Sequence, residues 1–290
     1  MPLFQNRELP EWEQDELDIR TVELKGKINV AEIFEKWRKC AQNAWMGDEN
    51  QRKFWKSFAE KAEHCDEEAD ISQLGIVTIR NKDDRKHFVF SGNKSTSTNL
   101  VTLGIGEDIS AELHFQRKHK KLGRSIDFFG ADPMTTVNPQ LYSKIGTYFP
   151  YAVSMNSGVS TASVLFKNKY VEQKVEHKNI VDFVKQDLNI SKIDNLWMDA
   201  EFAEYELFEI FRKNSTFATS GIEVCQVNIE IHLNQYVKLE QNPELQYRFS
   251  KFVKMIISDG KFGIFRVFDA LHLRIFMFNF QSDYCREKFF

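Results

Sequence analysis

The 290-residue sequence contains little of the two residues that interrupt regular structure, with 13 glycines and 6 prolines. Long flexible linkers are therefore not expected. No stretch approaches the 18 consecutive apolar residues of a membrane-spanning helix. The first residues are polar and acidic and lack the basic start and apolar stretch of a signal peptide. We expect a soluble protein, cytoplasmic by default, or one of the secretory lumen if a leader precedes this sequence.

Charge of neither sign dominates, because 39 Lys and Arg stand against 42 Asp and Glu. This balance excludes a polybasic nucleic-acid-binding protein. The distribution is uneven, with 17 acidic and 11 basic residues in the first 70 positions. We therefore predict a helical extension over residues 1–70, followed by an α/β domain over residues 71–290.

Only four cysteines are present, Cys40, Cys65, Cys225 and Cys285, and none forms a C-x-x-C pair. A zinc ribbon and a thioredoxin motif are thereby excluded. Buried free thiols are the favoured interpretation, and a Cys40–Cys65 bridge is the alternative for a secreted protein. Because no H-E-x-x-H motif or other metal-ligand spacing occurs, no metal site is predicted.

Bulky apolar residues are plentiful, with 26 phenylalanines and a hydrophobic fraction of 42%. Asn29 followed by Glu32 has the pattern of a helix N-cap with its reciprocal partner. Apolar residues at helical spacing then predict one helix over residues 30–45 and a second around residues 54–62. Their apolar faces are expected to pack into a core.

Strands and helices alternate along the rest of the chain. Two short apolar runs over residues 74–79 and 87–90 predict a hairpin. From residue 100 onward, strand-like runs alternate with helical stretches, which favours a parallel sheet covered on both faces. The runs at 262–270 and 271–280 have almost no connector, so they must pair antiparallel. The fold class is therefore a mostly parallel sheet closed by a C-terminal antiparallel hairpin.

In such sheets ligands bind beyond the carboxyl ends of the strands. Candidate site residues therefore follow from the strand assignments. The first long strand ends in a two-glycine turn, the second in an aspartate, the fourth in D-x-E and the fifth in E-x-H. These residues are Gly104, Gly106, Asp132, Asp199, Glu201, Glu230 and His232.

Four segments in order resemble motifs of the FkbM-type methyltransferases, in particular their nematode branch. They are VTLGIGEDISAE, FFGADP, NLWMDAE with AEY, and VCQVNIEIH. The resemblance covers about residues 97–285. It implies a Rossmann-like fold that binds S-adenosylmethionine and transfers its methyl group to an oxygen. The implied acceptor is a sugar, a glycan or another small hydroxylated metabolite.

The resemblance also implies roles for individual residues. Glu201 or His232 would be the general base for the acceptor hydroxyl, Asp199 would hold the cofactor or orient the site, and Glu230 belongs to the same E-x-H motif. The alternative for each is a structural hydrogen bond at a strand end. Cofactor-binding positions would be Gly104, Gly106, Glu107, Asp108, Asp132 and Asp199, with the glycines at the methionine end and Asp132 at the ribose.

Three positions depart from the family pattern. Thr102 replaces the usual acid before the first glycine, and Asp108 occupies the third glycine position. Phe202 replaces the glycine after D-x-E, which would be costly if that position requires a positive φ or close backbone approach. The alternative function is therefore a binding or scaffold protein that keeps the fold without turnover. A nicotinamide-dependent oxidoreductase is disfavoured because G-x-G-x-x-G is absent.

Overall fold

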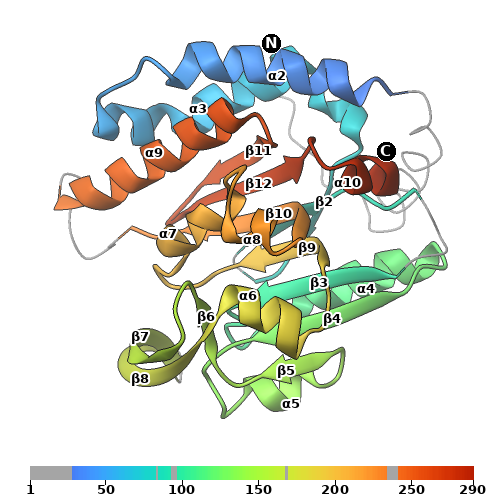
Figure 1. Cartoon of the computed structure of the whole chain (residues 1–290), viewed down its shortest axis with the longest axis vertical. Coiled ribbons are helices and arrows are strands. Elements are labelled where there is room, and N and C mark those ends of the chain that lie inside the picture. The colour runs from blue at the N-terminus through green and yellow to red at the C-terminus, as the bar shows by residue number, and fades with distance from the viewer. Residues whose placement is uncertain (1–27, 83, 93–96, 167–168, 234–240) are drawn as a thin grey trace, which may run out of the picture.

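The computed structural model describes residues 28–82, 84–92, 97–166, 169–233 and 241–290. Its centre is a seven-stranded sheet in the order β11-β12-β10-β9-β3-β4-β5 (Figure 1). The strands are β3 (Thr98–Leu103), β4 (Ile126–Ala131), β5 (Thr147–Phe149), β9 (Lys192–Met198), β10 (Glu223–Ile231), β11 (Phe262–Asp269) and β12 (Leu273–Asn279).

The pairing of these strands confirms the predicted sheet. Neighbours from β5 through β4, β3 and β9 to β10 are all parallel. β12 pairs antiparallel with both β10 and β11. Because β3 lies between β4 and β9, the strand order reverses there, and the ends of β3 and β9 border the position where open α/β sheets bind ligands.

Three long helices lie beside the β11–β12 end of this sheet (Figure 1), namely α2 (Val30–Trp45), α3 (Gln51–Ala69) and α9 (Pro243–Asp259). Trp37 of α2 packs edge-on against Phe265 of β11, and Phe58 of α3 packs against Phe249 of α9. The described N-terminal helices thus share one core with the sheet. Residues 1–27 lie outside the described part of the chain, and a division at residue 70 stays a prediction.

Local signals placed several elements correctly. The Asn29 side chain accepts a hydrogen bond from the Glu32 amide at the start of α2. The helical stretch that follows the first long strand is α4 (Ser110–Lys121). The predicted hairpin is β1 (Val77–Arg80) paired with β2 (Arg85–Phe88).

Other segments are shorter or more divided than expected. The strand-like run TYFPYAV over residues 147–153 is split at Pro150, which has no amide hydrogen to donate. Its second part, β6 (Ala152–Ser154), joins a separate sheet in the order β6-β8-β7, at the opposite end of the molecule from α2 and α3 (Figure 1). The other strands of that sheet are β7 (Gly158–Phe166) and β8 (Lys169–Asn179).

The described part of the chain also contains several short helical elements. They are η2 (Ile71–Leu74), α5 (Asn138–Tyr142), α6 (Ile180–Asp182), the π-helix η3 (Phe183–Asp187), α7 (Glu204–Leu207), η4 (Phe208–Phe211), α8 (Thr216–Thr219) and α10 (Asp283–Phe289).

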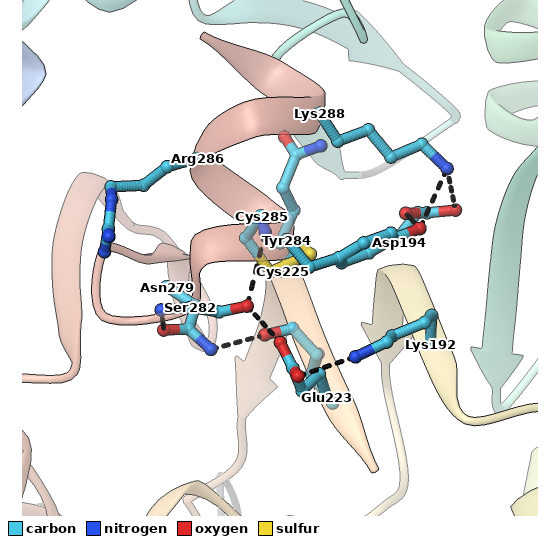
Figure 2. Close-up of a disulfide and its surroundings, with 12 residues drawn as sticks. Lys192, Asp194, Glu223, Cys225, Asn279, Ser282, Tyr284, Cys285, Arg286 and Lys288 are labelled. Atoms are coloured by element: carbon cyan, nitrogen blue, oxygen red, sulfur yellow. Dashed lines mark hydrogen bonds and ion pairs between the residues drawn. A yellow bond between two sulfur atoms is a disulfide. The ribbon is translucent and has the colours of Figure 1, made fainter. Parts of the chain in front are cut away.

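The preferred interpretation of the cysteines as free thiols is wrong. Cys40 pairs with Cys65 between α2 and α3, which was the alternative, and Cys225 pairs with Cys285. The second pair was not foreseen because α10 was not predicted. That helix returns to the sheet, so that Cys285 reaches Cys225 in β10 (Figure 2).

Candidate active site

A cavity of about 530 Å³ opens at the carboxyl ends of β3, β4 and β9. The β6-β8-β7 sheet supplies a second wall. The lining includes Leu103, Gly104, Gly106, Ala131, Asp132, Ser154, Ser157, Ser160, Thr161, His177, Asp199, Glu201, Phe202 and Glu206. Among the described residues, the structure thus brings together Gly104, Gly106, Asp132, Asp199 and Glu201 from the sequence-based list. Glu107 and Asp108 lie outside this lining.

Gly104 and Gly106, in the first turn, are required to be glycine for different physical reasons. Gly104 has a φ of +84°, and a Cβ atom there would lie 1.8 Å from the carbonyl oxygen of Asp199. Gly106 has a φ of +62°, but a Cβ there would meet no atom within 4 Å. Close backbone contact between β3 and β9 therefore requires glycine at 104, whereas position 106 requires only a positive φ.

Asp132 holds the glycine turn in place. Its Oδ2 accepts a hydrogen bond from the Ile105 amide at 2.7 Å, and its Oδ1 accepts one from the Met134 amide at 2.7 Å. Burial raises the pKa of this carboxyl, although the backbone hydrogen bonds oppose that shift. Asp132 thus lines the cavity while its oxygens support the turn, and its contact with a ribose stays a prediction.

His232 follows β10 and is 3% exposed. Its backbone amide donates to Glu204 Oε1 at 2.8 Å, and its Nδ1 lies 3.1 Å from the same oxygen. Its Nε2 faces Asp199 Oδ1 at 3.4 Å and Glu201 Oε2 at 3.7 Å. Burial by itself would lower the pKa of His232, but the hydrogen bond and charge of Glu204, with the charge of Asp199, raise it to about 10.

Glu230 lies behind the cavity in an ion-pair network. Its Oε1 pairs with the Arg274 guanidinium at 2.8 Å, and Arg274 Nε pairs with Asp84 at 2.7 Å. Asp84 also pairs with Lys86. Burial and the charge of Asp199 raise the pKa of Glu230 to about 8, against the opposing effect of Arg274.

Sequence reasoning missed Glu204 and Arg274. Arg274 stands directly opposite Glu230 in the β10–β12 register, a pairing that was not predicted because only residues 262–270 and 271–280 were expected to pair antiparallel. Glu204 follows Glu201 by three residues at the start of a helix. That spacing gave no sign that its side chain turns toward the strand after it.

A comparison with protein families assigns residues 40–278 to the methyltransferase FkbM domain. The chain belongs to this family. Neither the comparison with curated proteins nor that with solved structures gave a match. Membership confirms the suspected family and agrees with the Rossmann-like methyltransferase fold of the central sheet. In the described residues, no helix combines the length and apolar character needed to cross a membrane.

Two departures from the FkbM pattern have structural explanations. Thr102, in place of the usual acid, donates a hydrogen bond to Glu112 Oε1 at 3.1 Å, so that α4 supplies a carboxylate beside this position. Burial raises the pKa of Glu112 to about 7. Asp108, at the third glycine position, accepts a hydrogen bond from the Ser110 amide at 2.9 Å and thereby stabilises the first turn of α4.

At the third departure from the FkbM pattern, Phe202, the backbone is strained. Phe202 has a φ of +78° and follows Glu201, whose φ is +44°. The left-handed conformation costs about 1–2 kcal/mol for a residue with a Cβ. The Phe202 ring lies 5.6 Å from the His232 ring and is 39% exposed at the edge of the cavity. The phenylalanine thus occupies a glycine-type conformation, and the 530 Å³ cavity remains beside it.

Proposed function

We propose that the protein transfers the methyl group of S-adenosylmethionine to an oxygen of a sugar or another small hydroxylated molecule. The observation that carries this proposal is the cavity at the ends of β3, β4 and β9, bordered by the Gly104 turn and Asp199. Family membership supports methyl transfer at this place in the fold.

The chain's own residues position the two reactants. Gly104 and Gly106 would border the methionine end of the cofactor, and Asp132 would lie toward its ribose. When bound, S-adenosylmethionine would supply a methyl group on a sulfonium sulfur; its transfer to the acceptor oxygen would break the carbon–sulfur bond, leave a neutral thioether and release the hydroxyl proton to water. Because the sulfonium is already activated, alignment of the reactants supplies much of the rate.

We propose that the acceptor lies against the wall that the β6-β8-β7 sheet supplies. Ser157, Ser160 and Thr161 line the cavity there, and Asp199 and Glu201 line it beyond the end of β9. Hydroxyl side chains can donate and accept hydrogen bonds, which suits a neutral polyhydroxylated acceptor. We propose that Glu201 contacts the reacting hydroxyl. His232 is too buried to be the base.

Calorimetric titration with S-adenosylhomocysteine tests the cofactor assignment. We expect saturable one-site binding by the native chain and a ten- to hundredfold weaker affinity for Asp132→Ala, since removing hydrogen bonds from a charged group costs about 1.5–3 kcal/mol. Asp127→Ala is the matched control, because Asp127 is an exposed acid at the other end of β4. Absence of binding by the folded native chain at millimolar ligand would refute the proposal.

The strained Phe202 favours a second candidate, a binding or scaffold protein without turnover. Phe202→Gly should raise the free energy of unfolding by about 1 kcal/mol, because glycine adopts positive φ without the Cβ penalty. Phe202→Ala is the control, since it removes the ring and keeps the penalty. Methylation assays of all three chains on a hydroxylated-acceptor panel separate the candidates. Turnover that appears only in Phe202→Gly supports the scaffold, and turnover by the native chain rejects it.

We also infer that the protein works in an oxidising compartment. All four cysteines are paired in two buried disulfides, and structural disulfides are rare in reducing compartments. Protein isolated from its own cells under acid quench should resist alkylation at every cysteine until it is reduced. Four alkylated thiols before reduction would contradict this inference.

A further inference from the structure

Three carboxylates surround the Nε2 atom of His232 at distances longer than hydrogen bonds. Asp199 Oδ1 lies at 3.4 Å, Glu201 Oε2 at 3.7 Å and Glu230 Oε1 at 4.0 Å. A charge-assisted hydrogen bond between a ring nitrogen and a carboxylate measures about 2.7–2.9 Å. The three oxygens therefore lie around the ring nitrogen, but farther from it than a charge-assisted hydrogen bond requires.

The spacing suits ligands that share one metal ion. Nitrogen and carboxylate ligands lie about 2.0–2.2 Å from a transition metal such as zinc, so two ligands of one ion are roughly 3–4.3 Å apart. The candidate ligand atoms of Asp199, Glu201 and His232 all lie within 4.8 Å of one another. Small side-chain adjustments would bring the three to a common ion.

The opposite side of the ring is arranged as in metal-binding histidines. Glu204, which is 0% exposed, lies 3.1 Å from His232 Nδ1 and also accepts the His232 amide hydrogen. A carboxylate on the second ring nitrogen fixes the ring and directs the other nitrogen toward a metal. Here that other nitrogen is Nε2, which faces Asp199 and Glu201.

The charges around the cluster also favour a bound cation. Asp199 Oδ1 is buried and accepts no hydrogen bond from the described residues. The nearby cations Arg274 and Lys86 are engaged in ion pairs with Asp84, and Arg274 also with Glu230. A buried carboxylate oxygen without a donor is costly unless a cation satisfies it, and a metal ion that replaces the Nε2 proton of His232 would supply that charge.

We propose that Asp199, Glu201 and His232 bind one divalent transition-metal ion at the wall of the cavity. One imidazole and two carboxylates suit manganese, iron, cobalt or zinc. Asp199 and Glu201 face the cavity, so the open coordination positions would point toward the acceptor. Sequence reasoning predicted no metal site because the ligands follow two different strands and have no motif spacing.

The role of the ion, unlike its binding, rests on the proposed function. A bound metal lowers the pKa of a coordinated hydroxyl and orients it. The acceptor oxygen would lose its proton to water in the cavity and form a bond to the methyl carbon as the carbon–sulfur bond breaks. Glu201 would then act on the acceptor oxygen through the ion, in place of a direct contact with the hydroxyl.

Manganese binding tests the site directly. The full chain is freed of metal by a chelator, dialysed and titrated with MnCl₂, and the paramagnetic resonance signal of free Mn²⁺ is followed. We expect one Mn²⁺ per chain, with affinity reduced about tenfold or more in Asp199→Asn and in Glu201→Gln. We expect a ten- to hundredfold loss in Glu204→Gln, as for other residues that hold a metal-binding histidine.

Glu206→Gln is the matched control, because Glu206 also lines the cavity but lies outside the cluster. Its affinity for Mn²⁺ should equal that of the native chain. Circular dichroism and thermal unfolding establish that each variant is folded. The proposal is overturned if the folded native chain binds neither Mn²⁺ nor Zn²⁺, or if Asp199→Asn and Glu206→Gln lose affinity equally.

S-adenosylhomocysteine binding, measured with and without chelator, separates this proposal from the proposed function. Cofactor binding without any metal binding would reject the metal site and leave methyl transfer standing. Metal binding without cofactor binding would support the metal site and reject methyl transfer.

Discussion

Replacing Gly104 with alanine is expected to lower the free energy of unfolding by about 3 kcal/mol or more and to abolish S-adenosylhomocysteine binding. The new methyl group would lie 1.8 Å from the carbonyl oxygen of Asp199, far inside van der Waals contact. The obstacle is backbone at the end of a central strand, which cannot rotate away as a side chain could. β3 and β9 would have to separate at the edge of the cavity.

Gly106→Ala is the matched control for this prediction. It introduces the same methyl group two residues away, at a φ of +62° and in open space. The expected cost is only about 1 kcal/mol, from the backbone conformation alone. Urea titration of both variants measures the difference. Equal losses at the two positions would show that backbone conformation, and not contact with Asp199, decides the identity of residue 104.

Removing the Cys225–Cys285 disulfide by a double alanine substitution is expected to lower the free energy of unfolding by about 4 kcal/mol. This bond joins residues 60 positions apart, and a longer closed loop restricts the unfolded chain more. Removing Cys40–Cys65, with a separation of 25, should cost about 3.5 kcal/mol by the same relation. Urea titration of the two double variants, each without a leftover thiol, gives both values.

Non-covalent contacts should keep α10 folded onto the sheet when this bond is absent. The Lys288 ammonium pairs with Asp194 at 2.8 Å, and Ser282 bonds to Glu223, which also pairs with Lys192 (Figure 2). We therefore expect a cooperative transition at lower urea. Unchanged stability would mean that the bond does not restrict the unfolded chain, and a separate early transition would mean that the bond alone holds α10.

The central sheet could be predicted because its evidence is local. Apolar runs of strand length, helical spacing and caps such as Asn29 with Glu32 act over a few residues. The antiparallel end followed from the short connection between β11 and β12. Positions at strand ends then located Gly104, Asp132, Asp199 and Glu201 at one cavity.

Partners distant in sequence could not be predicted. Glu204 binds His232 across 28 positions, and Cys225 pairs with Cys285 across 60. Nothing local to these residues specifies such contacts, because they exist only once helices and strands have packed. Short elements such as α7 and η4 could not be delimited from the sequence either, since packing, and not helix propensity, limits their length.

The sequence by itself determined the family, the mostly parallel sheet and the strand ends that border the cavity. Only the tertiary structure decided that His232 sits between Glu204 and the cavity carboxylates, that Glu230 is engaged by Arg274, and that every cysteine is paired. The reason is that periodicity and turn chemistry are properties of neighbouring residues. The charge state of a buried group and its capacity to hold a metal depend on atoms brought together from several strands.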